Sequence, residues 1–168
     1  MAKKYQQRPS MTIDKNKKYS ALVHTVRGDF TIQLRPDLAP ETVNSFVFLA
    51  KDGYYNGTTF HRVIPRFVVQ GGDPTGTGAG GPGYTVPAEF TKTPFERGTV
   101  GLARANDPNS GGSQFFVDLA PQPGLNGQYT VFGQVTSGME VVDCITPRDP
   151  SRGGPPGDAI TGIEIKEE

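Results

Sequence analysis

Alternation between apolar and polar residues predicts β-strands along most of the chain. Residues 19–25 (YSALVHT) and 30–34 (FTIQL) alternate on either side of Arg27-Gly28-Asp29, which is typical of a β-hairpin. Short runs rich in β-branched and aromatic residues, each bounded by glycine, proline or asparagine, indicate further strands. These runs lie at 58–63, 66–70, 99–104, 114–119, 129–135 and 159–167. The pattern therefore predicts a mostly β protein with seven or eight strands.

Helical spacing of apolar residues predicts two α-helices. The first opens at 39–42 (APET), since proline suits the first helical turn and the Glu41 carboxylate complements the helix dipole. Its apolar positions are Val43, Phe46, Val47 and Ala50, and Gly53 stands where a helix cap belongs. A second, short helix is expected at 138–145, with Cys144 packed at the edge of its apolar face. An antiparallel sheet can close on itself to remove its edges, so we expect a closed barrel capped by two helices.

The length and the glycine and proline content fit this picture. A chain of 168 residues is one domain and can bury about 70 % of its unfolded surface. The 22 glycines and 15 prolines disfavour a helical bundle, since these are the two weakest helix formers. They concentrate at 71–83 and 147–157, which we expect to be long loops, and long loops in compact domains are often functional.

The charge is balanced overall but uneven along the chain. Residues 1–20 carry six basic residues and one acidic residue, whereas the remainder carries eleven basic and sixteen acidic residues. We therefore expect 1–18 to be a basic, flexible arm and 19–168 to be the folded domain. The acidic body argues against a nucleic-acid surface, and a weak tether to anions is the alternative use of the arm.

Nothing in the sequence predicts secretion or membrane insertion. The basic N-terminal residues are not followed by the apolar run of a signal peptide, and no stretch of 18 apolar residues occurs. The single cysteine, Cys144, cannot form an internal disulfide. We therefore expect a cytoplasmic protein, most simply a monomer.

Residue spacing disfavours three common kinds of site. Residues 76–81 match GxGxxG, but Pro82-Gly83-Tyr84 follows where a dinucleotide site needs a helix. His24 and His61, with one cysteine in the chain, lack the spacing of a zinc site. Ser113 lies outside the GxSxG elbow of hydrolases. We therefore predict no cofactor and no bound metal.

Three segments instead place guanidinium or amide donors beside aromatic residues at predicted strand ends. They are 60–73 (FHRVIPRFVVQGGD), 109–116 (NSGGSQFF) and 125–133 (LNGQYTVFG). Such a surface suits an apolar ring and the peptide groups around it better than a phosphate. In the first segment, strand alternation predicts that His61 points away from Arg62 and is structural.

The segments FHRVIPRFVVQGGDPTGTGAGGPGY, GLARANDPNSGGSQFF and LNGQYTVFGQV resemble, in order and spacing, three signature blocks of the cyclophilin family of peptidyl-prolyl cis–trans isomerases. The resemblance extends from about Tyr19 to Lys166 and is strongest to short, single-domain prokaryotic members. It implies an eight-stranded antiparallel β-barrel capped by two α-helices. It also implies a substrate, an X–Pro bond in a peptide or a folding protein.

The resemblance also implies roles for individual residues. The family's catalytic arginine falls on Arg62, with Phe67 in the proline pocket and Gln70 as the glutamine that contacts the substrate backbone. The remaining substrate-binding positions fall on Val68, Ala103, Arg104, Gln114, Phe116, Leu125 and Tyr129. Arginine suits the chemistry, because a fixed cationic donor gains more from the pyramidal nitrogen of a twisted X–Pro bond than from the planar one.

Two departures from the family pattern and one alternative function remain. Many members carry a tryptophan where this chain has Gly124, and that tryptophan helps to bind cyclosporin, so we expect weak cyclosporin binding. Val68 replaces a methionine, which makes the pocket floor shorter and stiffer. The alternative is a proline-peptide binding module or chaperone without turnover. The presence of both Arg62 and Gln70 favours the enzyme, because a pure binder could dispense with Arg62.

Overall fold

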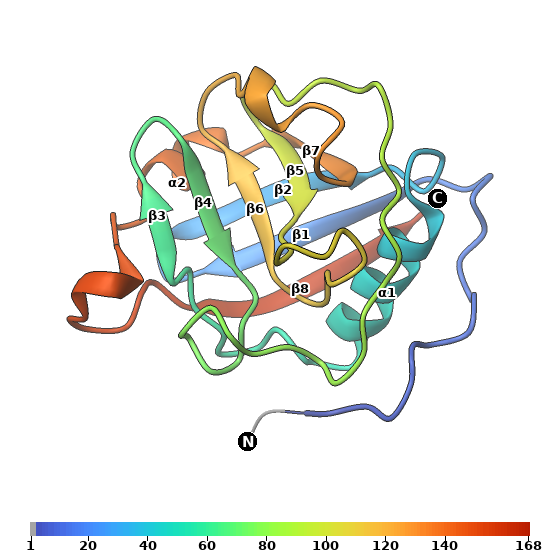
Figure 1. Cartoon of the computed structure of the whole chain (residues 1–168), viewed down its shortest axis with the longest axis horizontal. Helices are drawn as coiled ribbons and strands as arrows, with labels where there is room; N and C mark the ends of the chain where they lie inside the picture. Colours follow the sequence, from blue (N-terminus) through green and yellow to red (C-terminus); the bar gives the residue numbers. More distant parts are fainter. Residues whose placement is uncertain (1–2) are drawn as a thin grey trace.

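The computed structural model describes residues 3–168 and contains one eight-stranded antiparallel sheet (Figure 1). The strands are β1 (Tyr19–Thr25), β2 (Gly28–Leu34), β3 (Arg62–Ile64), β4 (Val68–Gly71), β5 (Thr99–Leu102), β6 (Phe115–Asp118), β7 (Val131–Ser137) and β8 (Ile160–Glu167). The helices are α1 (Pro40–Lys51) and α2 (Met139–Asp143), with 3-10 turns η1 (Pro123–Leu125) and η2 (Pro150–Arg152). Each of the eight predicted strand runs overlaps one observed strand, which confirms the mostly β prediction.

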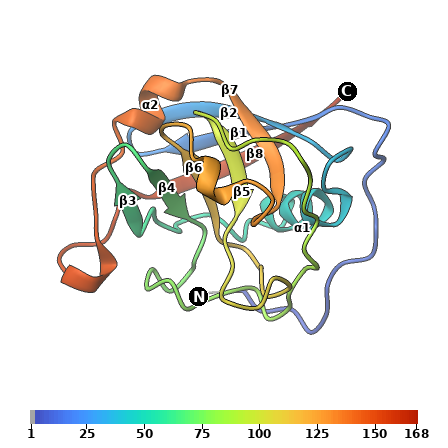
Figure 2. The ribbon, with the colours of Figure 1, turned by 45° about the horizontal axis from the view of Figure 1, so that its top comes forward.

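The sheet curls strongly but stays open, so the predicted closed barrel is wrong (Figures 1 and 2). Its order is β3-β4-β6-β5-β7-β2-β1-β8, and within residues 3–168 the edge strands β3 and β8 do not pair. β3 is short, and its outer edge pairs with Arg148, through N–H···O bonds of 2.8 and 3.0 Å between Arg148 and Val63. Residues 58–60, predicted as the start of a strand, lie outside β3 and instead bond to residues 158–160. The result is a half-barrel.

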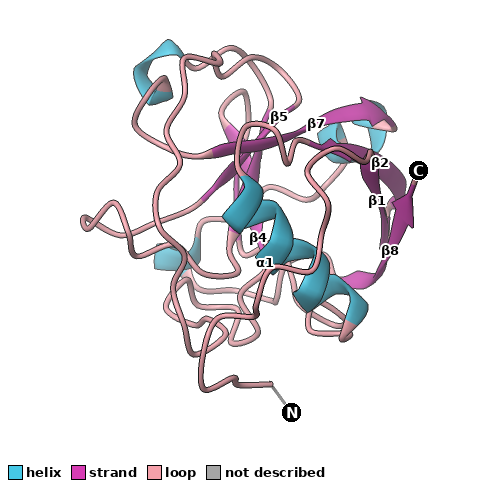
Figure 3. Ribbon diagram, turned by 90° about the vertical axis from the view of Figure 1, so that its right-hand side faces the viewer, coloured by secondary structure: helices cyan, strands magenta, loops and turns pink. Residues whose placement is uncertain are grey.

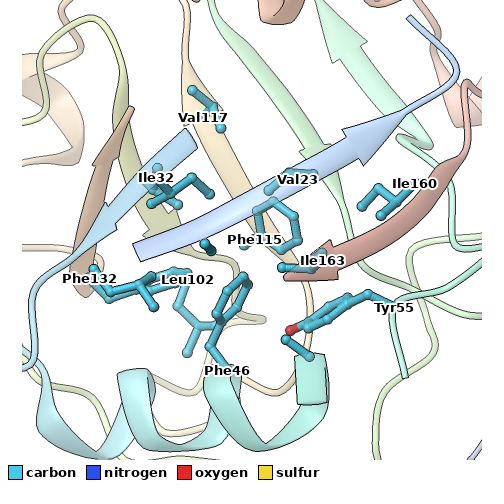
Figure 4. Packing of buried hydrophobic residues seen from close by; sticks show 14 of the residues in the cluster. Val23, Ile32, Phe46, Tyr55, Leu102, Phe115, Val117, Phe132, Ile160 and Ile163 are labelled. Atoms are coloured by element: carbon cyan, nitrogen blue, oxygen red, sulfur yellow. The ribbon is translucent and has the colours of Figure 1, made fainter. Parts of the chain in front are cut away.

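Helix α1 lies across the open side of this half-barrel (Figure 3). Phe46 points from the helix into the curl of the sheet, where its ring lies 5.7 Å from Phe115 and 5.4 Å from Phe132 (Figure 4). The start of α1 has no cap from Ala39, and Glu89 supplies one from a distant loop. Its carboxylate accepts hydrogen bonds from the Glu41 and Thr42 backbone N–H groups at 3.1 and 2.8 Å. The buried side of α1 and the inner face of the sheet together form the main hydrophobic core.

Helix α2 is shorter than expected and packs against β2. It ends at Asp143, so Cys144 forms the helix cap and its side chain is exposed. The predicted packing of Cys144 is therefore wrong, because the apolar face that continues through Val142 and Ile145 points away from it.

The segment before β1 runs along the outside of the molecule, past α1 (Figure 1). The Tyr5 N–H donates to Pro82 O at 2.8 Å, and the Thr12 N–H donates to the Asn44 side chain at 2.9 Å. Part of the predicted arm, residues 1–2, lies outside the described residues. The flexibility predicted for residues 1–18 stays a prediction. Within residues 3–168, no helix is both long and apolar enough to cross a bilayer.

Asp118 is a carboxylate buried in the interior of the protein, and we expect it to make the stability depend on pH. The residue is 0 % exposed, and within the described chain neither carboxylate oxygen has a hydrogen-bond partner. Burial raises its pKa to about 8. The folded protein therefore keeps a proton that the unfolded chain releases near pH 4, so the free energy of unfolding falls as pH rises from about 4 to about 8.

Denaturant unfolding at a series of pH values measures this dependence. Asp118→Asn should flatten the slope between pH 5 and pH 8, since the amide does not titrate. The control is Asp143→Asn, which removes an exposed carboxylate paired with Arg97 at 2.6 Å and with a lowered pKa. It should leave the slope in this range unchanged. A slope that survives in Asp118→Asn would contradict the assignment.

Candidate active site

The register of three strands places Arg62, Gln70 and Phe116 side by side on one face of the sheet. Arg62 on β3 lies opposite Gln70 on β4, and Gln70 lies opposite Phe116 on β6. Residues directly opposite one another in a sheet project to the same side. The intervening residues, such as Val69 and Val117, project into the main core. Strand alternation thus separates the core face from a candidate site face.

A second, smaller hydrophobic cluster lies under this face. Its buried members are Val68, Phe95, Phe116 and Val131. The Phe95 and Phe116 rings stack with centroids 5.7 Å apart, and Tyr129 meets Phe116 edge-on at 5.7 Å. The Phe95 N–H donates to the Asn126 side chain at 2.7 Å, which ties the loop around Leu125 to the cluster. The floor of the site is therefore rigid and apolar.

A cavity of about 310 Å³ opens above the cluster. It is lined by His61, Arg62, Phe67, Val68, Gln70, Gly78, Ala103, Arg104, Phe116, Leu125, Tyr129 and Pro150. Nine of the ten residues predicted from the sequence are brought together here. The tenth, Gln114, lines a neighbouring cavity of about 510 Å³. Its amide oxygen accepts a hydrogen bond from the Gln70 side chain at 3.1 Å, so it supports the first cavity from behind.

The Arg62 guanidinium lines the cavity, and within the described residues its N–H donors have no partner. Its central carbon lies 5.5 Å from the centroid of the Phe67 ring, within the range of a cation–π contact. No carboxylate or other side chain within residues 3–168 forms an ion pair or hydrogen bond with it. A guanidinium carries five N–H donors in a fixed fork. The site therefore presents an unused cationic donor beside an apolar floor.

Gln70 is held by a relay that ends in the glycine-rich loop 71–83. Gln114 accepts from Gln70 through its oxygen, and its nitrogen donates to Gly78 O at 2.9 Å and to Gly80 O at 3.0 Å. These bonds fix the orientation of both amide groups. The Gln70 side chain consequently keeps one oxygen acceptor for a ligand in the cavity.

Asp73 in turn shapes that loop. Its carboxylate is 0 % exposed and accepts five hydrogen bonds from the loop. The donors are the Thr75 N–H and hydroxyl and the N–H groups of Thr77, Gly78 and Gly80. Burial alone would raise the pKa of Asp73, but these hydrogen bonds outweigh it and keep the pKa below its usual value.

Arg104 forms the wall between the two cavities. Its guanidinium donates to Gln128 O at 2.8 and 3.0 Å and to Ala105 O at 2.9 Å. It also lies 4.7 Å from the centroid of the Tyr129 ring. The side chain is thus committed to holding the loop that carries Leu125 and Tyr129, which the sequence did not indicate.

The sequence missed several residues of the site. His61 lines the same cavity as Arg62, and strand alternation does not apply to it because β3 begins only at Arg62. Burial lowers the pKa of His61, which favours the neutral ring. Phe95, Gly78 and Pro150 come from distant loops and had no local signal, although the glycine-rich composition of 71–83 pointed to that loop. Within residues 3–168, no three histidine, cysteine or carboxylate side chains come together as a metal site.

Comparison with known proteins places this geometry in a family. Residues 20–165 match the family model of cyclophilin type peptidyl-prolyl cis-trans isomerases. Over 130 residues the chain is 51 % identical to a probable peptidyl-prolyl cis-trans isomerase of Brucella suis, and the match covers 70 % of this chain and 66 % of that protein. Over 110 residues it is 56 % identical to peptidyl-prolyl cis-trans isomerase B of Bacillus subtilis, covering 64 % of this chain and 76 % of that protein.

Solved structures agree with the sequence comparisons. The crystal structure of a cyclophilin type peptidyl-prolyl cis-trans isomerase from Cryptosporidium parvum matches with a TM-score of 0.81 at 34 % identity. The match covers 89 % of this chain and 98 % of that one. The chain belongs to the cyclophilin-type peptidyl-prolyl cis-trans isomerase family.

Proposed function

We propose that the chain catalyses rotation about X–Pro bonds in peptides and folding proteins, with the prolyl ring in the 310 Å³ cavity and Arg62 directed at the prolyl nitrogen. The observation that carries the proposal is the free guanidinium of Arg62 above the apolar floor. The Cryptosporidium parvum relative has also been crystallised in the presence of the dipeptide Ala-Pro, a ligand of the size this cavity would accept.

The lining of the cavity suits a prolyl ring. Phe67, Val68, Phe116 and Leu125 provide apolar contact on the floor and walls. Burying apolar area contributes about 25 cal/mol per Å², so the ring itself supplies the anchor. Arg62 and Gln70 are the polar groups that face the peptide bond. Such a combination of an apolar pocket and a few fixed donors favours orientation as well as binding.

The same arrangement lowers the barrier to rotation. The C–N bond resists rotation by ~18–20 kcal/mol, because the nitrogen lone pair is delocalised into the carbonyl. When the bond twists, the nitrogen becomes pyramidal and its lone pair can accept a hydrogen bond. Arg62 donates to that lone pair, so the guanidinium stabilises the twisted state more than either planar isomer. No covalent bond breaks, and the anchored ring and the Gln70 contact let one side of the bond turn against the other.

Arg62→Ala tests the proposal directly. Loss of a donor that acts on the transition state reduces rate by about 100-fold or more. We therefore expect kcat/KM for an Ala-Pro peptide to fall by about this factor in a protease-coupled assay, while the affinity for proline peptides stays within a few-fold. Arg66→Ala is the matched control, since Arg66 is exposed in the turn of the same hairpin and does not line the cavity. It should retain the wild-type rate.

The wild type and Arg62→Ala could bind proline peptides equally while the wild type fails to accelerate isomerisation. This result would contradict the enzymatic function and favour the proline-peptide binding module. Equal rates in the wild type and Arg62→Ala would leave the activity in place and contradict the role of Arg62.

We also propose that the chain binds cyclosporin weakly, because Gly124 leaves one wall of the site open. Gly124 precedes Leu125 in η1, and a Cβ at this position would meet no atom within 4 Å. Gly124→Trp can therefore introduce a side chain whose Cβ meets no neighbouring atom. We expect it to raise cyclosporin affinity at least tenfold in an inhibition titration, with the uninhibited rate on a short peptide unchanged. Nanomolar inhibition of the unaltered protein would contradict this prediction.

A further inference from the structure

The second cavity, of about 510 Å³, adjoins the first. Gly78, Ala103 and Arg104 line both cavities, so a peptide with its proline in the first can extend directly into the second. The glycine-rich residues 78–83 form one wall and residues 103–105 form another. One further lining residue comes from the N-terminal segment, and this residue is Lys4.

Lys4 is held in place by specific contacts of the segment around it. Its ammonium group donates to Gly81 O at 2.7 Å, and the neighbouring Tyr5 N–H donates to Pro82 O at 2.8 Å. Gly83 adopts φ 97°, and a Cβ there would lie 2.6 Å from Tyr5 O, so a glycine is required for this approach. Lys4 and its neighbour Tyr5 thus contact two successive backbone carbonyls at the rim of the cavity, those of Gly81 and Pro82.

The Tyr5 side chain anchors the same segment on the body of the protein. Its ring lies 5.2 Å from Phe48 and 6.3 Å from Tyr84, and its hydroxyl donates to Asp52 at 2.5 Å. These are contacts with α1 and with the glycine-rich loop. The anchor therefore connects Lys4 to two parts of the fold.

The charge around Lys4 is not balanced by the protein. Lys3, Arg8 and Lys17 each lie within 4 Å of a carboxylate, namely Asp52, Glu41 and Glu167. Within the described chain Lys4 has no such partner. The charged residues that line the second cavity are Lys4 and Arg104, both cationic, and no acidic residue lines it. A negative side chain entering the cavity would meet two cations and no acidic residue among the residues that line it.

We infer that Lys4 makes the second cavity a subsite for an acidic side chain of the substrate, located on the N-terminal side of the X–Pro bond. The inference rests on the proposed isomerase activity and adds a specificity to it. Lys4 takes no part in the rotation itself, and its contribution is to binding. The expected preference is about two- to fivefold in kcat/KM, the range of one partly exposed ion pair.

The test compares blocked peptides that differ by one side chain. Each contains Ala-Pro, with either glutamate or glutamine placed two or three residues before the proline. The cis–trans exchange rate of each peptide is measured by NMR with catalytic amounts of the full chain at low salt, which needs no coupling protease. The result is expressed as the ratio of kcat/KM for the glutamate peptide to that for the glutamine peptide.

Three variants separate a local effect from net charge. Lys4→Gln should bring the ratio to about one, and Lys4→Glu should bring it below one. Lys3→Gln removes the same charge one residue away, but from the ion pair with Asp52, and should keep the wild-type ratio. In 1 M salt the preference should disappear, since the Debye length is then about 3 Å.

A ratio of one for the wild type at both positions would overturn the inference and leave the isomerase activity standing. An equal loss in Lys3→Gln and Lys4→Gln would also overturn it, because net charge would then account for the preference. Failure to accelerate exchange of the glutamine peptides would contradict the proposed function itself, and the subsite with it.

Discussion

The buried carboxylate of Asp73 is the constraint on which the rest of the site depends. It lies at the end of the segment that leaves β4 and gathers five donors from residues 75–80. Charge-assisted hydrogen bonds of this kind are about twice as strong as neutral ones. Gly80 approaches so closely that a Cβ there would collide with the carboxylate. These contacts stabilise the loop in the conformation in which its carbonyls orient Gln114 and, through it, Gln70.

The same loop defines both cavities. Gly78 lies in the wall that they share, and Gly81 and Pro82 receive the N-terminal segment. The buried Asp73 carboxylate thus supports the walls of both cavities through this loop. The sheet positions the remaining groups. Alternation along β4 and β6 directs Val69 and Val117 into the core. It directs Gln70 and Phe116 toward the site. Rigid strands and one fixed loop together position the groups around the proposed substrate.

Local patterns in the sequence predict the elements well, because strand alternation and turn residues act over a few neighbours. The strands and α1 follow these patterns. The closed barrel was wrong, since whether β3 meets β8 depends on Arg148, which is distant in sequence and occupies the edge of β3. Cys144 was misplaced because α2 ends at Asp143, one residue before it.

Residues that line the cavity can be predicted from the sequence where contiguous segments carry them. The donors and aromatics of 60–73, 109–116 and 125–133 already suggested a groove for an apolar ring, and the family resemblance assigned their roles. Phe95 and Lys4 could not be predicted in this way. Both reach the groove through long-range packing, Phe95 by stacking on Phe116 and Lys4 through contacts with the 78–83 loop. Arg104 holds the loop of Leu125 and Tyr129 through hydrogen bonds to Gln128 O, and the sequence does not show this long-range contact.

Catalysis of X–Pro rotation is measured most directly by NMR exchange spectroscopy on an unlabelled Ala-Pro peptide with a small fraction of an equivalent of the full chain. Uncatalysed exchange takes tens to hundreds of seconds, which is too slow to give exchange peaks between the cis and trans resonances. If the chain is an isomerase, such peaks appear and their intensity grows with protein concentration. Shifts of the peptide resonances without any exchange peaks would show binding alone and would contradict catalysis.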